Sequence, residues 1–107
     1  MEIRQHKSYL RRLTALQACA MMATVVDEDA ARSEMLPLIL EMATDDVPNI
    51  RFNVAKELES IAPVCGLSTY ESQISPVLHM LVEDADRDVR FYSEKTTRAL
   101  DEVFNHQ

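Results

Sequence analysis

Glycine, proline and tryptophan are scarce in this 107-residue chain, which has one Gly, four Pro and no Trp. Glycine and proline supply many tight β-turns, and glycine-rich loops build the common phosphate-binding motifs. Their scarcity leaves little material for a hairpin-rich β protein or a nucleotide-binding loop. Because 47% of the residues are apolar and 27% are charged, the chain can still bury one modest core.

Basic residues are also few, since 11 Lys and Arg face 18 Asp and Glu and the net charge is −7. Phosphate binding needs a clustered excess of basic side chains, so the balance argues against a nucleic-acid partner and weakly against anionic membranes. No segment approaches the ~20 apolar residues of a membrane span, and no signal-peptide run opens the chain. We expect a cytoplasmic protein that is also found in the nucleus.

Residue groupings typical of catalysis or metal binding are lacking as well. Cys19 and Cys65 show no metal-ligand spacing, so we expect free thiols in a reducing compartment. No Ser, Cys or His residues form a nucleophile–base grouping. Asp84, Asp86 and Asp88 match the opening of a calcium loop, but the Gly and the closing Glu of such a loop are missing. We therefore expect no enzyme activity, no metal and no other cofactor.

The chain does contain an internal repeat of 39 residues. The segment DDVPNIRFNVAK at 45–56 returns in weaker form as DADRDVRFYSEK at 84–95. Identical residues in ungapped register are Pro37 and Pro76, Asp45 and Asp84, Arg51 and Arg90, Phe52 and Phe91, and Lys56 and Lys95. A period near 40 residues with helical periodicity is typical of HEAT or armadillo solenoids.

Apolar periodicity and capping signals predict five helices, at 8–26, 30–43, 48–62, 69–82 and 87–104. Residues 1–7 are expected to be a frayed lead-in. Pro37 and Pro76 predict a bend, or the start of the regular part, in the helices that contain them. The residues expected to face inward are Leu36, Ile39, Leu40 and Ala43, then Ile50, Val54, Leu58 and Ile61, then Ile74, Val77, Leu78 and Leu81, and finally Val89, Thr96, Leu100 and Val103.

Helix ends are predicted from a few residues between these segments. Pro48 suits a first helical position, and Pro63 with Gly66 should end the helix that begins there. Ser68 and Glu71 match a capping box, which would open the next helix. The methionines, including Met21, Met22, Met35 and Met42, are expected to fill the core.

The predicted helices compose one all-α solenoid over residues 1–107, with a half repeat at 8–27 and repeats at 30–64 and 68–104. The first helix fits the second half of a repeat, because Arg12 lies 39 residues before Arg51. We therefore expect the chain to be part of a longer array.

The strings SYLRRLTAL and MLPLILEMATDDVPNIRFNVAKELESIAPV, with the repeat at 68–92, closely resemble the C-terminal HEAT repeats of the scaffold (A) subunit of protein phosphatase 2A. The likeness runs from about Ser8 to about Leu100. Three features depart from that family: Asp46 replaces a usual proline, the end DEVFNHQ is more polar, and the preceding repeats are absent.

The resemblance implies a non-catalytic scaffold whose inter-helix turns dock the phosphatase catalytic subunit, while missing repeats would bind regulatory subunits. It places Tyr9, Arg12, Val47, Pro48 and Asn49 at the catalytic subunit, with the turn at 86–88 as a weaker candidate. It also implies an inter-repeat charge ladder made of Asp45, Arg51, Asp84 and Arg90.

Several of these residues, and the two phenylalanines of the repeat, have a plainer interpretation. Val47 could pack beneath a helix start, Tyr9 and Arg12 could lie on a solvated helix, and Phe52 and Phe91 are expected to be packing residues. Two other functions stay open, a HEAT adaptor of another system such as nuclear transport and a self-contained helical regulatory domain. The string NIRFNVAK argues against the first, and the start on a half repeat argues against the second.

An array that starts on a half repeat leaves one apolar face without a neighbour. We expect Leu10, Leu13, Leu16 and Met21 to lose part of their cover. Exposed apolar patches tend to find a partner, so we expect the chain to self-associate through its first helix.

Overall fold

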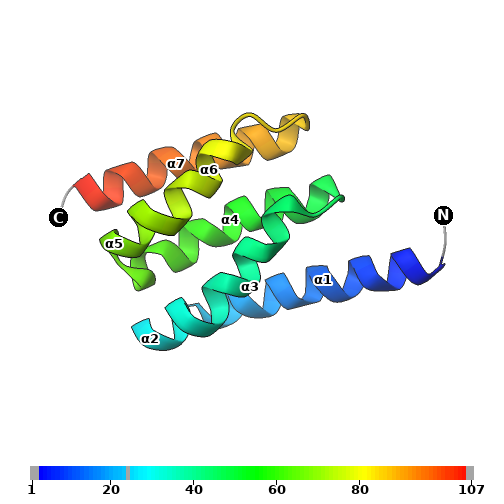
Figure 1. Cartoon of the computed structure of the whole chain (residues 1–107), viewed down its shortest axis with the longest axis horizontal. Coiled ribbons are helices and arrows are strands. Elements are labelled where there is room, and N and C mark those ends of the chain that lie inside the picture. The colour runs from blue at the N-terminus through cyan, green and yellow to red at the C-terminus, as the bar shows by residue number, and fades with distance from the viewer. Residues whose placement is uncertain (1–2, 24, 106–107) are drawn as a thin grey trace.

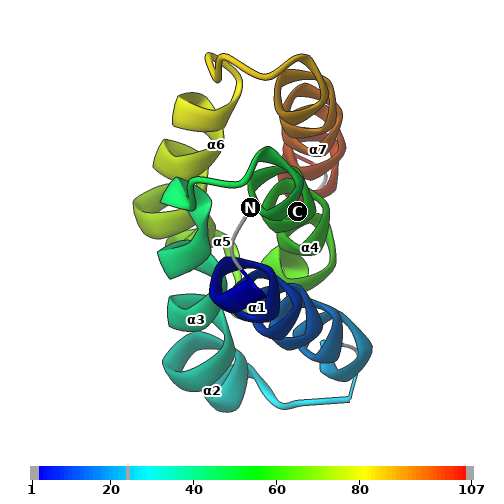
Figure 2. The ribbon, with the colours of Figure 1, turned by 90° about the vertical axis from the view of Figure 1, so that its right-hand side faces the viewer.

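The computed structural model describes residues 3–23 and 25–105, and within them every regular element is helical. Two layers make up the fold (Figures 1 and 2). The B layer holds three long helices, α1 (Ile3–Met22), α4 (Pro48–Cys65) and α7 (Arg87–Asn105). The chain forms an elongated body of 47 × 28 × 18 Å.

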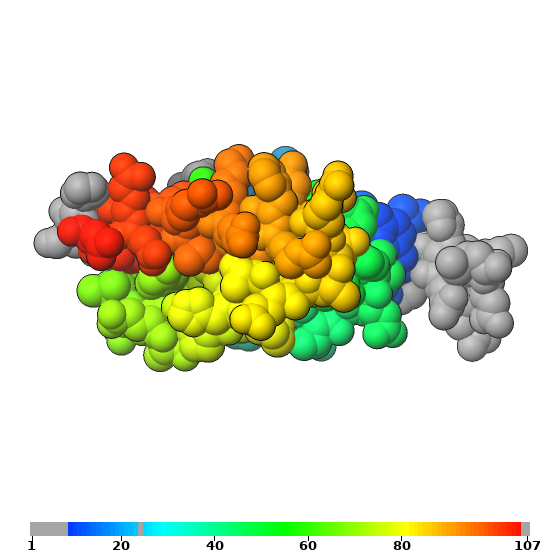
Figure 3. Space-filling view, turned by 90° about the horizontal axis from the view of Figure 1, so that it is seen from above, coloured from blue at the N-terminus to red at the C-terminus, as the bar shows by residue number. Residues whose placement is uncertain are grey.

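The A layer consists of two bent helices that cover one side of the B layer (Figure 2). The first joins α2 (Glu28–Ala30), η1 (Ala31–Met35), α3 (Leu36–Glu41) and η2 (Met42–Thr44). The second joins α5 (Leu67–Thr69), η3 (Tyr70–Ile74) and α6 (Ser75–Leu81). Figure 3 shows α7 lying alongside this second bent helix. The all-α solenoid expected from the sequence is confirmed.

Each bent helix contains one π-turn directly before its proline. The N–H of Leu36 bonds to the carbonyl of Ala31, and the N–H of Ser75 bonds to the carbonyl of Tyr70, both five residues back. Proline lacks an N–H and crowds the preceding turn, and a π-turn is a common place for a helix to bend. The regular helices α3 and α6 then have the proline within their first two positions.

Two predictions about helix ends are wrong, and a third is confirmed only for its glycine. The first helix already includes residues 3–7, whereas Met1 and Glu2 lie outside the described residues. Pro63 lies inside α4, which continues to Cys65 and ends where Gly66 takes a φ of 94°, a conformation that favours glycine. Ser68 forms no cap, because α5 begins directly after Gly66 and places Ser68 within its first turn.

The core lies between the two layers, with α4 at its centre, packed against α1, α3 and α7. The largest fully buried side chains are those of Leu16, Leu36, Ile39, Ile50, Val54, Leu58, Ile61, Ile74, Leu78, Leu81, Val89 and Leu100. Most of the predicted inward face is therefore buried. Val103 was assigned to that face wrongly, because it is 41% exposed and Phe104 packs there instead, stacked on Tyr70 with ring centroids 4.7 Å apart.

The outer face of α1 differs from the prediction. Leu16 is fully buried against α4, and Leu13 is half-buried. Met21 and Met22 do not fill the core, since they are 80% and 50% exposed. The exposed apolar side chains of this region are those of Leu10, Met21, Met22 and Val25.

Candidate functional site

The candidate site is the edge of the solenoid at which α4 and α7 begin. We call it the turn ridge, and it comprises residues 9–12 of α1, the turn at 45–49 and the turn at 82–88. Figure 1 shows both turns on the same side of the molecule as the N-terminal part of α1. The ridge thus gathers segments that are far apart in the sequence.

The two turns open their helices by different chemistry. Val47 is the cap residue of α4 and makes no side-chain capping bond, and Pro48, the first helical residue, has no N–H to satisfy. Asp86 stands in the equivalent place before α7, and its Oδ1 accepts hydrogen bonds from the backbone N–H groups of Asp88 and Val89 at 2.9 and 3.1 Å. A carboxylate here also compensates the positive end of the helix.

A line of arginines and aspartates ties the repeats together beneath the ridge. Arg51 donates from Nε and Nη2 to the two carboxylate oxygens of Asp84, at 2.8 and 3.0 Å. Its Nη1 donates to the backbone carbonyl of Asp45 at 2.7 Å. One side chain therefore joins its own turn to the turn of the next repeat, and such two-pronged contacts are among the stronger charged hydrogen bonds.

Arg12 makes the equivalent contact one repeat earlier. Its Nη2 donates to Oδ1 of Asp45 at 3.0 Å, and its Nε pairs with Oδ2 of the same carboxylate. The Arg12 side chain is 31% exposed and that of Asp45 is 9% exposed. Arg12 thus takes part in the inter-repeat line, a role that the sequence interpretation did not give it.

Arg90 ends this line in a different way. It donates from Nη1 to the carbonyls of Asp84 and Ala85, at 2.7 and 2.9 Å, so it repeats only the contact of Arg51 with its own turn. Among the four residues proposed for a ladder, Arg51 and Asp84 form the one arginine–aspartate ion pair. The second such pair joins Asp45 to Arg12, which was not part of the proposed ladder.

Hydrogen bonding to Arg51 lowers the pKa of Asp84, with smaller contributions from the Asp86 backbone and from the charges of Arg51 and Arg90. The same contact raises the pKa of Arg51. Both directions favour the charged forms of this pair.

The residues proposed for partner contact lie close together on the ridge. Tyr9 and Arg12 lie within α1 and not in a turn, because α1 begins at Ile3. The Tyr9 hydroxyl accepts a hydrogen bond from the side-chain amide of Asn49, which joins α1 to the start of α4. Val47 is half-buried against the core, while Pro48 and Asn49 are exposed.

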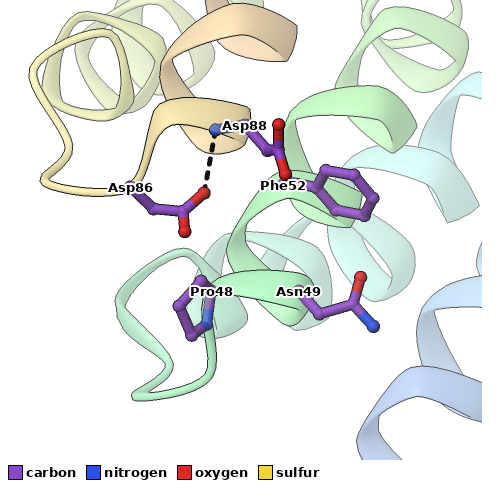
Figure 4. Close-up of a pocket in the computed structure, with 5 residues that line it drawn as sticks. All are labelled: Pro48, Asn49, Phe52, Asp86 and Asp88. Atoms are coloured by element: carbon purple, nitrogen blue, oxygen red, sulfur yellow. Dashed lines mark hydrogen bonds between the residues drawn. The ribbon is translucent and has the colours of Figure 1, made fainter.

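A second groove of the ridge lies between the starts of α4 and α7 and forms a cavity of about 260 Å³. Its lining residues are Pro48, Asn49, Phe52, Asp86 and Asp88 (Figure 4). The sequence interpretation had placed Asp86 and Asp88 only as weaker candidates and had not joined them to Phe52.

Aromatic and basic side chains form a cluster on the outer side of α4 and α7. Phe52 contacts Tyr92 edge-on with ring centroids 5.0 Å apart, and the Lys56 ammonium lies 5.6 Å from the Phe52 centroid and 5.3 Å from that of Tyr92. Phe91 was expected to pack, but it is 57% exposed and touches only the edge of Tyr92 among the aromatic rings. Tyr92 has no aromatic counterpart one repeat earlier, so the repeat alone did not indicate this cluster.

Glu57 is a partly buried ionisable group of α4 that lies away from the ridge. Burial raises its pKa, and one of its carboxylate oxygens is buried without a hydrogen-bond partner within the described residues. One repeat later the equivalent residue, Thr96, is buried and donates to the carbonyl of Ala55 at 2.9 Å. A neutral donor therefore satisfies this position better than a carboxylate does.

Glu57→Gln is expected to raise the free energy of unfolding at neutral pH by about 1 kcal/mol, because the neutral amide avoids the cost of a buried, unpaired carboxylate oxygen. The folded protein holds the Glu57 proton more tightly, so stability should fall as pH rises from the ordinary pKa through the raised one. Urea unfolding across pH 4–8 measures both effects. Glu59→Gln, an exposed neighbour, is the control, and equal behaviour of the two variants would contradict the assignment.

Two structural features are absent from the part of the chain that the structure describes. No cluster of three or more His, Cys, Asp or Glu side chains occurs there that could hold a metal ion. None of the helices within residues 3–23 and 25–105 has the length and hydropathy needed to cross a membrane.

Comparison with known proteins agrees with this fold. The HEAT repeat family model matches residues 35–65. The regulatory A subunit of protein phosphatase PP2A from Saccharomyces cerevisiae is 33% identical over 94% of this chain and 17% of its own length. The Schizosaccharomyces pombe protein of the same name is 38% identical over 60% of the chain and 11% of its length.

A human relative is the beta isoform of the 65 kDa regulatory A subunit of serine/threonine-protein phosphatase 2A, which is 37% identical over 50% of this chain and 9% of its own length. The chain thus spans less than a fifth of the length of these relatives. The chain is a HEAT-repeat array, and its repeats place it with the regulatory A subunits of protein phosphatase 2A.

Proposed function

We propose that this chain is a non-catalytic scaffold segment that docks the catalytic subunit of a serine/threonine phosphatase on its turn ridge. The observation that carries the proposal is the convergence of Tyr9, Val47, Pro48 and Asn49 on one edge of an array whose relatives are named phosphatase regulatory subunits. In this role the chain offers position and shape, and the bound subunit supplies the chemistry. Regulatory subunits would bind through repeats outside this chain, in the cytoplasm and the nucleus.

The ridge suits protein docking for physical reasons. The ion pairs Arg12–Asp45 and Arg51–Asp84 hold neighbouring repeats in register beneath the ridge. The exposed residues of the ridge are therefore presented on a rigid support. A preorganised surface loses less conformational entropy when a partner binds. Exposed Pro48 and half-buried Val47 add apolar area at the centre of the ridge, where contact residues contribute most to affinity.

The first experiment is a pull-down of the purified catalytic subunit with this chain alone. Wild-type chain should retain the subunit, and Val47→Asp should weaken binding roughly tenfold or more, because it places an unpaired charge in a desolvated contact. Val47 makes no capping bond through its side chain, so circular dichroism should show unchanged helical content.

Glu102→Gln, an exposed change on the last helix, should bind like the wild type. Arg12 is a poor choice for this test, since its pair with Asp45 would couple a loss of binding to a loss of stability. Equal retention of the wild type and the Val47→Asp variant would refute the docking assignment and leave the fold unaffected.

We also propose that the isolated chain self-associates through α1. The exposed side chains of Leu10, Met21, Met22 and Val25 form the apolar surface for it, which is smaller than the sequence suggested because Leu16 is buried. Sedimentation velocity should show a dimer that Met21→Glu dissociates. A wild-type chain that stays monomeric at high concentration would rule this out.

A further inference from the structure

We propose that the groove between the starts of α4 and α7 receives an arginine side chain of the protein that docks on the turn ridge. This inference rests on the proposed docking function and names the chemistry of one contact within it. The groove is the cavity of about 260 Å³ lined by Pro48, Asn49, Phe52, Asp86 and Asp88. Pockets for small-molecule ligands usually measure roughly 300–1,000 Å³, so this one suits a single side chain.

The internal repeat shows that this groove is chemically distinct. Shifting its five lining residues back by 39 positions gives the equivalent residues one repeat earlier, which are Tyr9, Leu10, Leu13, Val47 and Asn49. That set contains no charged residue, and the Tyr9 hydroxyl bonds across it to Asn49. In the second groove Val47 and Asn49 are replaced by the two carboxylates of Asp86 and Asp88.

An anion is a poor occupant even though two helices begin here. Helix starts attract anions through free backbone N–H groups, but Pro48 has none, and those of Asp88 and Val89 already bond to Asp86. The second oxygen of Asp86 and the carboxylate of Asp88 accept no hydrogen bond from the residues that the structure describes. Asp86 and Asp88 therefore give the groove free hydrogen-bond acceptors that carry negative charge.

These acceptors and the Phe52 ring fit a guanidinium group. Figure 4 shows Asp86 and Asp88 on the α7 side of the groove and Phe52 on the α4 side, and all three line the same cavity. Arginine can donate to carboxylates with its planar fork while its flat face and aliphatic stem lie against an aromatic ring. Arg51 interacts electrostatically with Asp86, but its hydrogen bonds go to the Asp84 carboxylate and the Asp45 carbonyl, so neither lining carboxylate accepts a bond from it.

The first test needs no phosphatase and uses N-acetyl-arginine methylamide as the probe, titrated into the 107-residue chain and followed by NMR. We expect saturable shifts at the Asn49 side-chain amide and at the backbone amides of Asp88 and Val89. The citrulline analogue, which has the same shape without the charge, should leave these signals unchanged. Absent shifts, or equal shifts with citrulline, would overturn the proposal.

The control variant separates charge from capping. In the double variant Asp86→Asn, Asp88→Asn, the asparagine at 86 still accepts from the first amides of α7, so the fold should persist while the arginine shifts disappear. Arginine shifts that persist in this variant would overturn the role of the two carboxylates.

The second test measures the affinity of the catalytic subunit for the same double variant. We expect a loss of roughly tenfold, against less than about twofold for Glu59→Gln, Glu102→Gln, which removes the same charge from exposed sites off the ridge. If Val47→Asp weakens binding but the groove variant matches this control, the groove proposal fails and the docking function stands. If the wild-type chain does not bind the subunit, the docking function fails, and the arginine titration alone decides whether the groove binds a guanidinium.

Discussion

Arg51→Ala is expected to lower the free energy of unfolding by roughly 2–4 kcal/mol, a large part of the stability of a small domain. The substitution leaves the Asp84 carboxylate without its two charged hydrogen bonds and the Asp45 carbonyl without its donor. The side chains of Arg51 and Asp84 are only 17% and 13% exposed, so water replaces these bonds poorly. Urea unfolding followed by circular dichroism measures the loss.

Arg90→Ala is the matched control, because Arg90 holds the same position one repeat later but bonds only to carbonyls of its own turn. We expect a loss of about 1 kcal/mol there. A double-mutant cycle with Asp84→Ala then isolates the coupling between Arg51 and Asp84. If Arg51→Ala and Arg90→Ala lower the free energy of unfolding equally, the ion pair between repeats adds no stability beyond the contact of each arginine with its own turn.

The Arg51–Asp84 pair also predicts that the free energy of unfolding depends on pH in the acid range. The pKa of Asp84 lies below its ordinary value of 3.8 in the folded chain, so the folded state binds fewer protons than the unfolded state in that range. The contribution of the pair is therefore present above the ordinary pKa and is lost as pH falls through the lowered pKa. The stability gap between wild type and Arg51→Ala should narrow over that acid range.

Leu16→Ala is expected to cost about 2–5 kcal/mol, since it removes a fully buried side chain from the contact of α1 with the rest of the fold. Leu10→Ala on the same helix should change stability by less than about 0.5 kcal/mol, because Leu10 is 46% exposed. Urea unfolding of both variants compares a buried and an exposed leucine on one helix. A small effect of Leu16→Ala would show that α1 is only loosely attached.

The repeat and its proline positions made most of the fold predictable. A shift of 39 residues aligns the two bent helices, and each proline occurs just after a π-turn, so local backbone chemistry determined the bend in both. The prediction was weaker at helix ends. Pro63 lies inside the last turn of α4 and does not end the helix, although it removes one backbone hydrogen bond to the preceding turn.

Side-chain orientation at the margins of the helices was harder to predict than the helices themselves. Val103 and Phe104 are adjacent, and only the stacking of Phe104 on Tyr70 decides which of them is buried. Leu16 and Leu10 both fit an apolar stripe, and contact with α4 selects Leu16. Which of two similar side chains is buried depends on contacts with residues that are distant in the sequence. Apolar periodicity along one helix carries no information about those contacts.

At the ridge, the resemblance to a known family identified residues that lie close together. The structure added the arginine–aspartate ion pairs beneath them. The sequence alone did not distinguish Arg12 as a partner of Asp45, although its spacing from Arg51 provided the signal. The groove between α4 and α7 joins Phe52 to residues more than 30 positions later, so only the folded chain brings them into one lining.

The docking of a phosphatase catalytic subunit on the turn ridge is tested most directly by hydrogen–deuterium exchange of this chain with and without the purified subunit. Docking on the ridge predicts slower exchange at 9–12, 47–52 and 84–90, and unchanged exchange at the opposite edge, at 25–30 and 64–69. Protection confined to that opposite edge, or identical exchange at saturating concentrations of the partner, would contradict it.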